Sequence, residues 1–194
     1  MIDSENLTRI NELIQSRRSV YPAQYNGEVI EEEQLKIVLE NANWAPTHKL
    51  TEPWRFKVIT GEARGRLADF MAKKYLETNQ DEFNEVKYNK LKTNPRKAGA
   101  ILLICLQRDP KERVPEWEEI ASVAMAVQNM WLTCHALNIG AYWSSPPYIN
   151  MMGEFTDLSE NERCIGLFYM GHYDVSAGGP NRTAIDSKIK WIKQ

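Results

Sequence analysis

The sequence predicts a single α+β domain over residues 1–194, and three observations predict it. Segments with helical spacing of apolar residues mix along the chain with short segments of strand character. The chain contains no internal repeat and no linker rich in Gly, Ser or Pro. Its 194 residues, 43% apolar and 26% charged, are typical of a globular protein that buries roughly 70% of its unfolded surface. Disordered, collagen-like and disulfide-scaffold classes are therefore excluded.

The first half of the chain predicts three helices and one strand. Apolar residues fall on one stripe in residues 4–17 and on one face in residues 31–45, which predicts two helices. Residues 54–60 alternate between two faces, as a strand does. Residues 62–75 again carry apolar side chains at helical spacing and predict a third helix.

The second half predicts a buried strand, a long helix and two further strands. Residues 100–106 are a continuous apolar run, typical of a strand that is buried on both faces. Residues 117–137 are apolar nearly all round and predict a central helix, which residues 138–140 bring to an end. Residues 142–144 and 164–170 have strand character.

One long segment contains no charged residues. Residues 120–153 contain no Asp, Glu, Lys or Arg, which is long enough to span a bilayer. Gln128 and Asn129 interrupt the segment, and Pro146-Pro147 ends its second half. We therefore expect a helix buried in the centre of the fold or at a subunit interface, and not a membrane span.

The overall charge gives no attraction toward nucleic acid or an anionic membrane. The formal net charge is −2, from 24 basic and 26 acidic side chains. Residues 77–97 are polar and Asn-rich, and their basic part, 87–97, could meet a phosphate. Acidic residues at 77–85 nearly cancel that charge, so we interpret the segment as a solvated, mobile face.

The cysteines indicate a reducing compartment. Cys105, Cys134 and Cys164 are odd in number, lie in apolar segments and show no C-x-x-C spacing. Buried thiols explain them better than a catalytic cysteine, because nothing nearby in sequence would lower a thiol pKa. Residues 1–5 are acidic and lack the order of a secretion signal, so we expect a cytoplasmic protein.

The motifs of several common enzyme classes are absent from the sequence. It contains no G-x-x-x-x-G-K-[ST], no G-x-G-x-x-G between strand and helix and no G-x-S-x-G. His48, His135 and His172 are far apart and have no i, i+4 partner or nearby cysteine pair, so no metal site is expected.

Two arginines and a serine follow the first predicted helix. Arg17 and Arg18 can fork onto phosphate oxygens, and Ser19 can bond to a sugar hydroxyl. The C-terminal end of a helix is negative, so side chains would have to supply the binding. The alternative is that both arginines cap helix carbonyls, and this segment alone does not decide between the two.

Five segments in a fixed order carry a more specific signal. They are Arg17-Arg18-Ser19; Trp44 to Lys49 with Glu52 to Phe56; Ala126 to Met130; Gly140 to Ser145; and Pro180-Asn181-Arg182. None is specific alone, but the ordered set resembles the FMN-dependent nitroreductase family from about residue 13 to residue 182. The resemblance implies a nitroreductase-like α+β fold, with a mixed or antiparallel central sheet flanked by helices, in an intertwined homodimer.

The resemblance also implies which residues bind FMN. The residues implied for the phosphate and ribityl chain are Arg17, Arg18, Ser19 and Arg182. Those implied for the flavin ring are Trp44, His48, Trp143, Ser144 and Ser145. Without the resemblance, we would interpret Trp44 as a core aromatic at a helix end and His48 as a loop histidine bonded to the backbone. Residues 133–138 match a segment associated with the nicotinamide donor, although packing explains them equally well.

Two departures from the family pattern bear on the flavin. Pro146 replaces a glycine whose amide follows the N5 contact, so we expect the backbone of Ser145 to donate to N5. Tyr21 stands where many relatives have Arg or Lys near N1 and C2=O. The negative charge of the reduced flavin is then either less stabilised or offset by another cation, such as Lys49.

The activity implied by the resemblance is hydride transfer from NADH or NADPH, through flavin N5, to a planar electron-poor acceptor. Nitroaromatics, quinones and conjugated carbonyls all qualify as this small-molecule acceptor. No side chain is expected to be catalytic, because the flavin carries the chemistry. The alternative function is a non-catalytic FMN-binding carrier or sensor, which the departures at Tyr21 and Pro146 favour.

Overall fold

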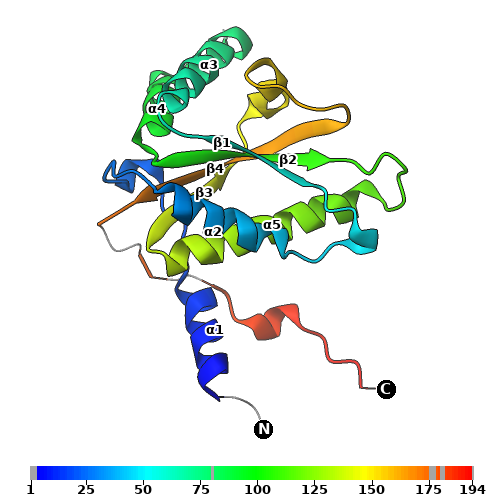
Figure 1. Ribbon diagram of the computed structural model, residues 1–194. Helices are drawn as coiled ribbons and strands as arrows, with labels where there is room; N and C mark the ends of the chain where they lie inside the picture. Colours follow the sequence, from blue (N-terminus) through cyan, green and yellow to red (C-terminus); the bar gives the residue numbers. More distant parts are fainter. Residues whose placement is uncertain (1–3, 80, 175–177, 180–181, 194) are drawn as a thin grey trace.

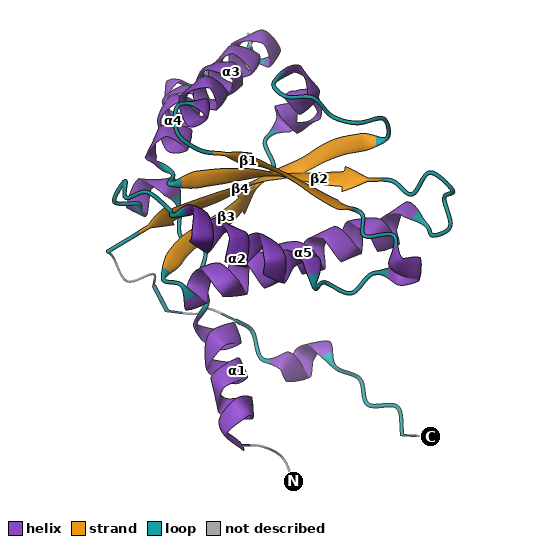
Figure 2. Cartoon of the chain, in the orientation of Figure 1, coloured by secondary structure: helices purple, strands orange, loops and turns teal. Residues whose placement is uncertain are grey.

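A computed structural model describes residues 4–79, 81–174, 178–179 and 182–193. Within them, an antiparallel sheet lies between α2 and α5 on one face and α3 and α4 on the other (Figures 1 and 2). The bounds of the helices and strands are α1 Ser4–Ser16, α2 Glu32–Asn43, β1 Trp54–Ile59, α3 Ala63–Thr78, α4 Glu85–Lys97, β2 Ala100–Gln107, α5 Glu116–Ala136, β3 Ile139–Ser144 and β4 Glu162–His172. The predicted α+β class, with an antiparallel sheet flanked by helices, is confirmed.

The sheet separates two hydrophobic cores. Its strands lie in the order β1-β2-β4-β3, and each neighbouring pair is antiparallel. Because side chains alternate along a strand, Leu102 and Ile104 of β2 pack under α2 and α5, whereas Ile101 and Leu103 pack under α3. The apolar run of β2 is therefore buried on both faces, as its sequence predicts.

Helix α5 runs along one face of the sheet, as the long apolar segment predicts. Asn138, with a φ of 55°, ends the helix in a left-handed conformation, and β3 begins at the next residue. Near the other end of the helix, the buried carboxylate of Glu119 accepts hydrogen bonds from Arg108 and from the backbone N–H of Asp109. Among the described residues, no helix is both long and apolar enough to cross a bilayer.

Most of the described residues in 77–97 are exposed, as expected for a solvated face, but much of the segment is helical. Helix α4 occupies its second half and packs beside α3 (Figure 1). The side chain of Asn84 caps the helix by accepting a 2.9 Å bond from the backbone N–H of Lys87. Arg96 donates bidentate bonds of 2.8 and 2.9 Å to Asp69 of α3. These contacts hold a helix that its polar sequence does not predict.

Two segments project from the body of the molecule. Helix α1 has no buried residue, and the described C-terminal residues 182–193 are exposed throughout (Figures 1 and 2). Ile10 and Ile14 of α1 are 53% and 50% exposed, and Trp191 is 79% exposed. Large apolar side chains on projecting segments are typical of an interaction surface.

The three thiols are predicted to be unreactive in the native protein. Cys105, Cys134 and Cys164 are all buried and unbridged. Burial raises the pKa of Cys134, and a hydrogen bond with Cys164 together with burial raises that of Cys105. A thiol-specific reagent should label no cysteine before unfolding and three afterwards, counted by mass spectrometry. Rapid labelling of the native protein would contradict the packing described here.

Candidate functional site

A cavity of about 530 Å³ lies beside the end of α1, where three arginines come together. The residues that line it are Ile14, Gln15, Arg17, Arg18, Ser19, Gly179 and Arg182. Arg17 and Arg182 come from opposite ends of the chain, so the fold brings together the two segments in which the sequence predicts phosphate contacts. Pro180 and Asn181, which precede Arg182, lie outside the described residues.

Arg17 is the most constrained member of this cavity. Its guanidinium carbon lies 4.6 Å from the ring centroid of Trp131 of α5, within range of a cation–π interaction. Its Nη1 atom is buried and has no hydrogen-bond partner among the described residues. Burial, followed by the charges of Arg182 and Arg18, lowers the pKa of Arg17. An anion in the cavity would satisfy the buried donor and offset this repulsion.

Arg18 fulfils the alternative role that the sequence leaves open. Its Nη1 donates to the carbonyl oxygens of Gln15 and Arg17 at 2.6 and 2.8 Å, and its Nε donates to that of Gly178 at 3.1 Å. The side chain therefore caps the last turn of α1 and also fixes residue 178 beside the cavity. The residues present fit a phosphate group, with Arg17 presenting the buried donor and Arg18 adding charge.

The segment after β3 borders a second cavity, of about 240 Å³, on the α4 side of the sheet. Ser144 and Ser145 line it together with Tyr142, whose ring lies 4.9 Å from that of Tyr21 between centroids. Tyr21 therefore lies near this segment, as the family pattern implies for the residue at its position. Its side chain is half exposed.

Trp143 points to the opposite face of the sheet. Strand alternation sends its ring into the core beneath α2 and α5, where it packs against the backbone of Gly166 in β4. A side chain at residue 166 would collide with this ring, which explains the glycine. In this chain the Trp143 side chain has a packing role, and its contact with a flavin stays a prediction.

Trp44 and His48 lie on the segment after α2, and neither lines the arginine cavity. Trp44 follows α2, is 77% exposed and donates its indole N–H to Glu40 at 3.2 Å. His48 Nδ1 lies 2.6 Å from a carboxylate oxygen of Glu118 in the first turn of α5. Lys49 Nζ donates to the carbonyl oxygen of Arg113 at 2.9 Å. Trp44 is therefore not a core aromatic, and the His48 side chain bonds to a carboxylate and not to the backbone in the described part of the chain.

One chain does not bring His48 to the arginine cavity. His48 contacts Glu118 near the start of α5, whereas Arg17 stacks on Trp131 near its end. At a rise of 1.5 Å per residue, those two positions are about 20 Å apart along the helix. The predicted site residues thus lie in separate places: the arginines and Ser19 line the arginine cavity, Ser144 and Ser145 line the second cavity, and Trp44 and His48 lie on the segment after α2.

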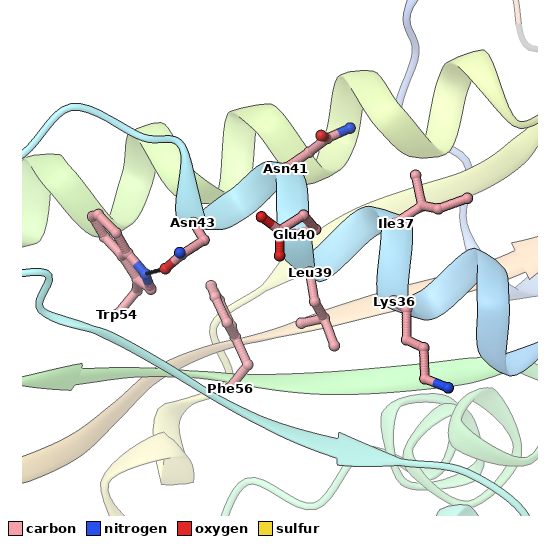
Figure 3. A pocket seen from close by; sticks show the side chains of 8 residues that line it. All are labelled: Lys36, Ile37, Leu39, Glu40, Asn41, Asn43, Trp54 and Phe56. Atoms are coloured by element: carbon pink, nitrogen blue, oxygen red, sulfur yellow. Dashed lines mark hydrogen bonds between the residues drawn. The ribbon is translucent and has the colours of Figure 1, made fainter.

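A groove between α2 and the edge strand β1 was not predicted from the sequence (Figure 3). It has a volume of about 700 Å³ and is lined by Lys36, Ile37, Leu39, Glu40, Asn41, Asn43, Trp54 and Phe56. Trp54 donates its indole N–H to Asn43 at 3.1 Å, which fixes one end of the groove. The available signal was Ile37, an apolar residue off the buried face of its helix and 47% exposed.

Comparisons with known proteins agree with this architecture. The model of the nitroreductase family matches residues 14–172. A protein of Bacillus subtilis called "Putative NAD(P)H nitroreductase YfhC" is 27% identical over 183 residues, which cover 93% of this chain and 92% of that protein.

Two solved structures share the fold. The nitroreductase-like family protein from Bacillus cereus is 27% identical with a TM-score of 0.78, and the match covers 95% of this chain and 96% of that one. The FMN-dependent nitroreductase NfnB from Mycobacterium smegmatis, solved with NADPH, has a TM-score of 0.79 at 17% identity and shows likeness of fold alone. Its match covers 97% of this chain and all of that chain. On the family match, which spans most of the sequence, this chain belongs to the nitroreductase family.

Proposed function

We propose that the protein is a single-domain, homodimeric, cytoplasmic oxidoreductase that uses FMN to pass a hydride from NADH or NADPH to a planar electron-poor acceptor. The observation that carries the proposal is the buried, unpartnered Nη1 of Arg17 in a cavity lined by Arg18, Ser19 and Arg182. Membership of the nitroreductase family and the "NAD(P)H nitroreductase" name of the Bacillus subtilis relative support the cofactor and the reductant. Three buried, unbridged thiols suit a reducing compartment.

The arginine cavity holds the phosphate end of FMN. Arg17 donates to phosphate oxygens from its buried edge, Arg182 closes from the C-terminal segment, and Ser19 bonds to the ribityl chain. When bound, FMN supplies hydride acceptance and donation at N5. Ser145 donates its backbone N–H to that atom, because Pro146 has no N–H to offer. Tyr21 lies beside Tyr142 and would border the N1 side of the ring.

A second copy of the chain completes the site with its own Trp44 and His48. In one chain His48 lies away from the arginine cavity, and the Trp44 side chain does not line that cavity and is 77% exposed. Helix α5 presents Trp117, Ile120 and Met125 to solvent, and they are 68%, 37% and 38% exposed. This apolar surface, with those of α1 and the C-terminal segment, suits an intertwined dimer.

The groove between α2 and β1 offers a place for the partner's C-terminal segment. An edge strand presents unpaired backbone groups that can accept another strand, and Leu39 and Phe56 provide an apolar floor (Figure 3). The exposed Ile189, Trp191 and Ile192 are of matching character. Exchange of these segments would tie the two chains together.

The net reaction on a nitroaromatic is a two-electron reduction. One NAD(P)H and one proton convert the nitro group to a nitroso group, and NAD(P)⁺ and water are released. The same two electrons convert a quinone to its hydroquinone, or saturate a conjugated carbonyl. Ser145 and the partner's Trp44 would orient the ring system of the bound cofactor.

Anaerobic mixing of the FMN-loaded protein with NADH or NADPH tests the proposal. Visible flavin absorbance should bleach with a rate constant on the order of 1 per second or higher with at least one nicotinamide. An added quinone should restore the absorbance. Protein that stays colourless after incubation with FMN would contradict the cofactor. Flavin that binds but is not bleached by either nicotinamide would favour the carrier or sensor function.

A further inference from the structure

Residues 47–52, which include His48 and which we call the strained loop, have an unusual backbone. Lys49, Leu50 and Glu52 have φ angles of 50°, 52° and 43°, in the left-handed region that residues other than glycine rarely adopt. Leu50 is 78% exposed, so burial of its side chain contributes little to this conformation. A strained backbone persists only where neighbouring groups impose it, and such residues cluster at functional sites. The contacts that hold the strained loop therefore bear on the role of His48.

Three bonds join the strained loop to the segment that leads into α5 and to its first turn. Lys49 Nζ donates to the carbonyl oxygen of Arg113 at 2.9 Å, and Arg113 Nη1 donates back to the carbonyl oxygen of Lys49 at 3.4 Å. His48 Nδ1 lies 2.6 Å from Glu118 Oε2. The Lys49 carbonyl belongs to the peptide group between two left-handed residues. The bond from Arg113 therefore acts on the strained part of the backbone itself.

Asp109 fixes Arg113 in turn. Its carboxylate accepts bonds from Arg113 Nε at 2.7 Å, from Nη2 at 3.3 Å and from the backbone N–H at 3.1 Å. The hydrogen bond from the Arg113 side chain lowers the pKa of Asp109 to about 2, so the pair is charged at neutral pH. The backbone N–H of Asp109 donates to the buried Glu119 of α5 at 2.9 Å. Polar contacts therefore run without a break from the buried side of α5, through Asp109 and Arg113, to the strained loop.

We propose that Asp109 and Arg113 are positioning residues that hold the strained loop in the conformation with which it completes the flavin site of the other subunit. Arg113 suits this role because a planar guanidinium can bond to a carboxylate and to a backbone carbonyl at once. A loop that is fixed before binding loses less conformational entropy when the cofactor binds. Neither residue lines the arginine cavity or the second cavity, so both act through the loop. The inference rests on the proposed function, because it needs the loop of one chain at the flavin of the other.

Limited proteolysis of the apoprotein tests the positioning role without the cofactor. Trypsin cleaves after lysine, and the bond between Lys49 and Leu50 lies within the strained loop. Arg113→Ala removes the donor to the Lys49 carbonyl and the ion pair with Asp109. We expect cleavage after Lys49 to become about tenfold faster, the factor for one charge-assisted bond. Asp109→Asn should act in the same direction. Mass spectrometry of the fragments measures this rate separately from cleavage at other sites.

Binding of FMN to the same variants tests whether the position of the loop matters to the flavin site. Arg113→Ala should raise the Kd for FMN about tenfold, again the factor for one charge-assisted bond. At saturating FMN, the bound flavin should also fluoresce more strongly than in the wild-type protein, because the indole of Trp44 quenches it less. A residue that supports only the fold would change the urea midpoint and leave the fluorescence of the saturated flavin unaltered.

Arg163→Ala is the matched control. Arg163 forms an ion pair of 2.6 Å with Glu116, in the same first turn of α5. The variant takes an arginine ion pair from this end of the helix and leaves the three bonds of the strained loop in place. It should change neither the rate of cleavage after Lys49 nor the affinity for FMN.

The outcomes separate this inference from the proposed function. Suppose that the wild-type protein binds FMN and is bleached by NAD(P)H. If Arg113→Ala and Asp109→Asn then keep the wild-type rate of cleavage after Lys49, or the wild-type affinity for FMN, the inference alone is overturned. An equal effect of Arg163→Ala also overturns it, because the start of α5 would then be loosened in general. A wild-type protein that does not bind FMN overturns the proposed function and the inference with it.

Discussion

Replacing Arg17 and Arg182 together by alanine is expected to weaken FMN binding about 10²–10³-fold. Each guanidinium forms a charge-assisted hydrogen bond to phosphate that is worth roughly 1.5–2 kcal/mol in net terms. The pair then contributes roughly 3–4 kcal/mol, which corresponds to that change in Kd. Removing Arg17 also removes the buried Nη1 donor and relieves its repulsion by Arg182 and Arg18, so the apoprotein should not lose stability to an unsatisfied group.

The matched control for this prediction is riboflavin, which lacks the phosphate. Fluorescence titration should show that the double variant loses affinity for FMN and keeps its weaker affinity for riboflavin. Arg66→Ala removes an exposed arginine from α3, on another face, and should change neither affinity. Equal loss of both flavins would mean that the two arginines support the fold and do not bind phosphate.

Much of the fold could be predicted because local sequence patterns indicate the helices and strands. The apolar run of β2 and the long apolar helix α5 are strong periodic signals, and the structure confirms both. Helix α4 lacks such a signal, because what holds it is a cap at Asn84 and the bidentate bonds of Arg96 to Asp69 on another helix. Contacts between distant residues of this kind cannot be inferred from a polar sequence.

The candidate site, too, could be predicted only in part. The ordered motifs select Arg17 and Arg182, and the fold places both at one cavity. The order of the motifs along the chain does not give the distances between them in the fold. The contacts of His48 and Arg17 with opposite ends of α5 show that these two residues lie apart within one chain. Strand alternation in β3, once its register is known, sends Trp143 into the core while Ser144 faces the second cavity, on the α4 side of the sheet.

Replacing Trp44 and His48 together by alanine is the second change with a large expected effect. If the partner's loop covers the flavin, the loss of aromatic stacking and of the imidazole should weaken FMN binding roughly 10- to 100-fold. The effect should appear although His48 contacts α5 about 20 Å along the helix from the tryptophan on which Arg17 of the same chain stacks. Unchanged affinity for FMN would contradict a role for this loop in the site.

A mixed dimer tests most directly whether each site is built from two chains. One chain carries Arg17→Ala and Arg182→Ala, the other carries Trp44→Ala and His48→Ala, and two different affinity tags isolate the mixed species. If each site joins the arginines of one chain to the loop of the other, one site has both defects and the second has none. The account predicts half the FMN content and half the activity of the wild-type dimer. Flavin content as low as in both parent variants would contradict it, because each site would then lie within one chain.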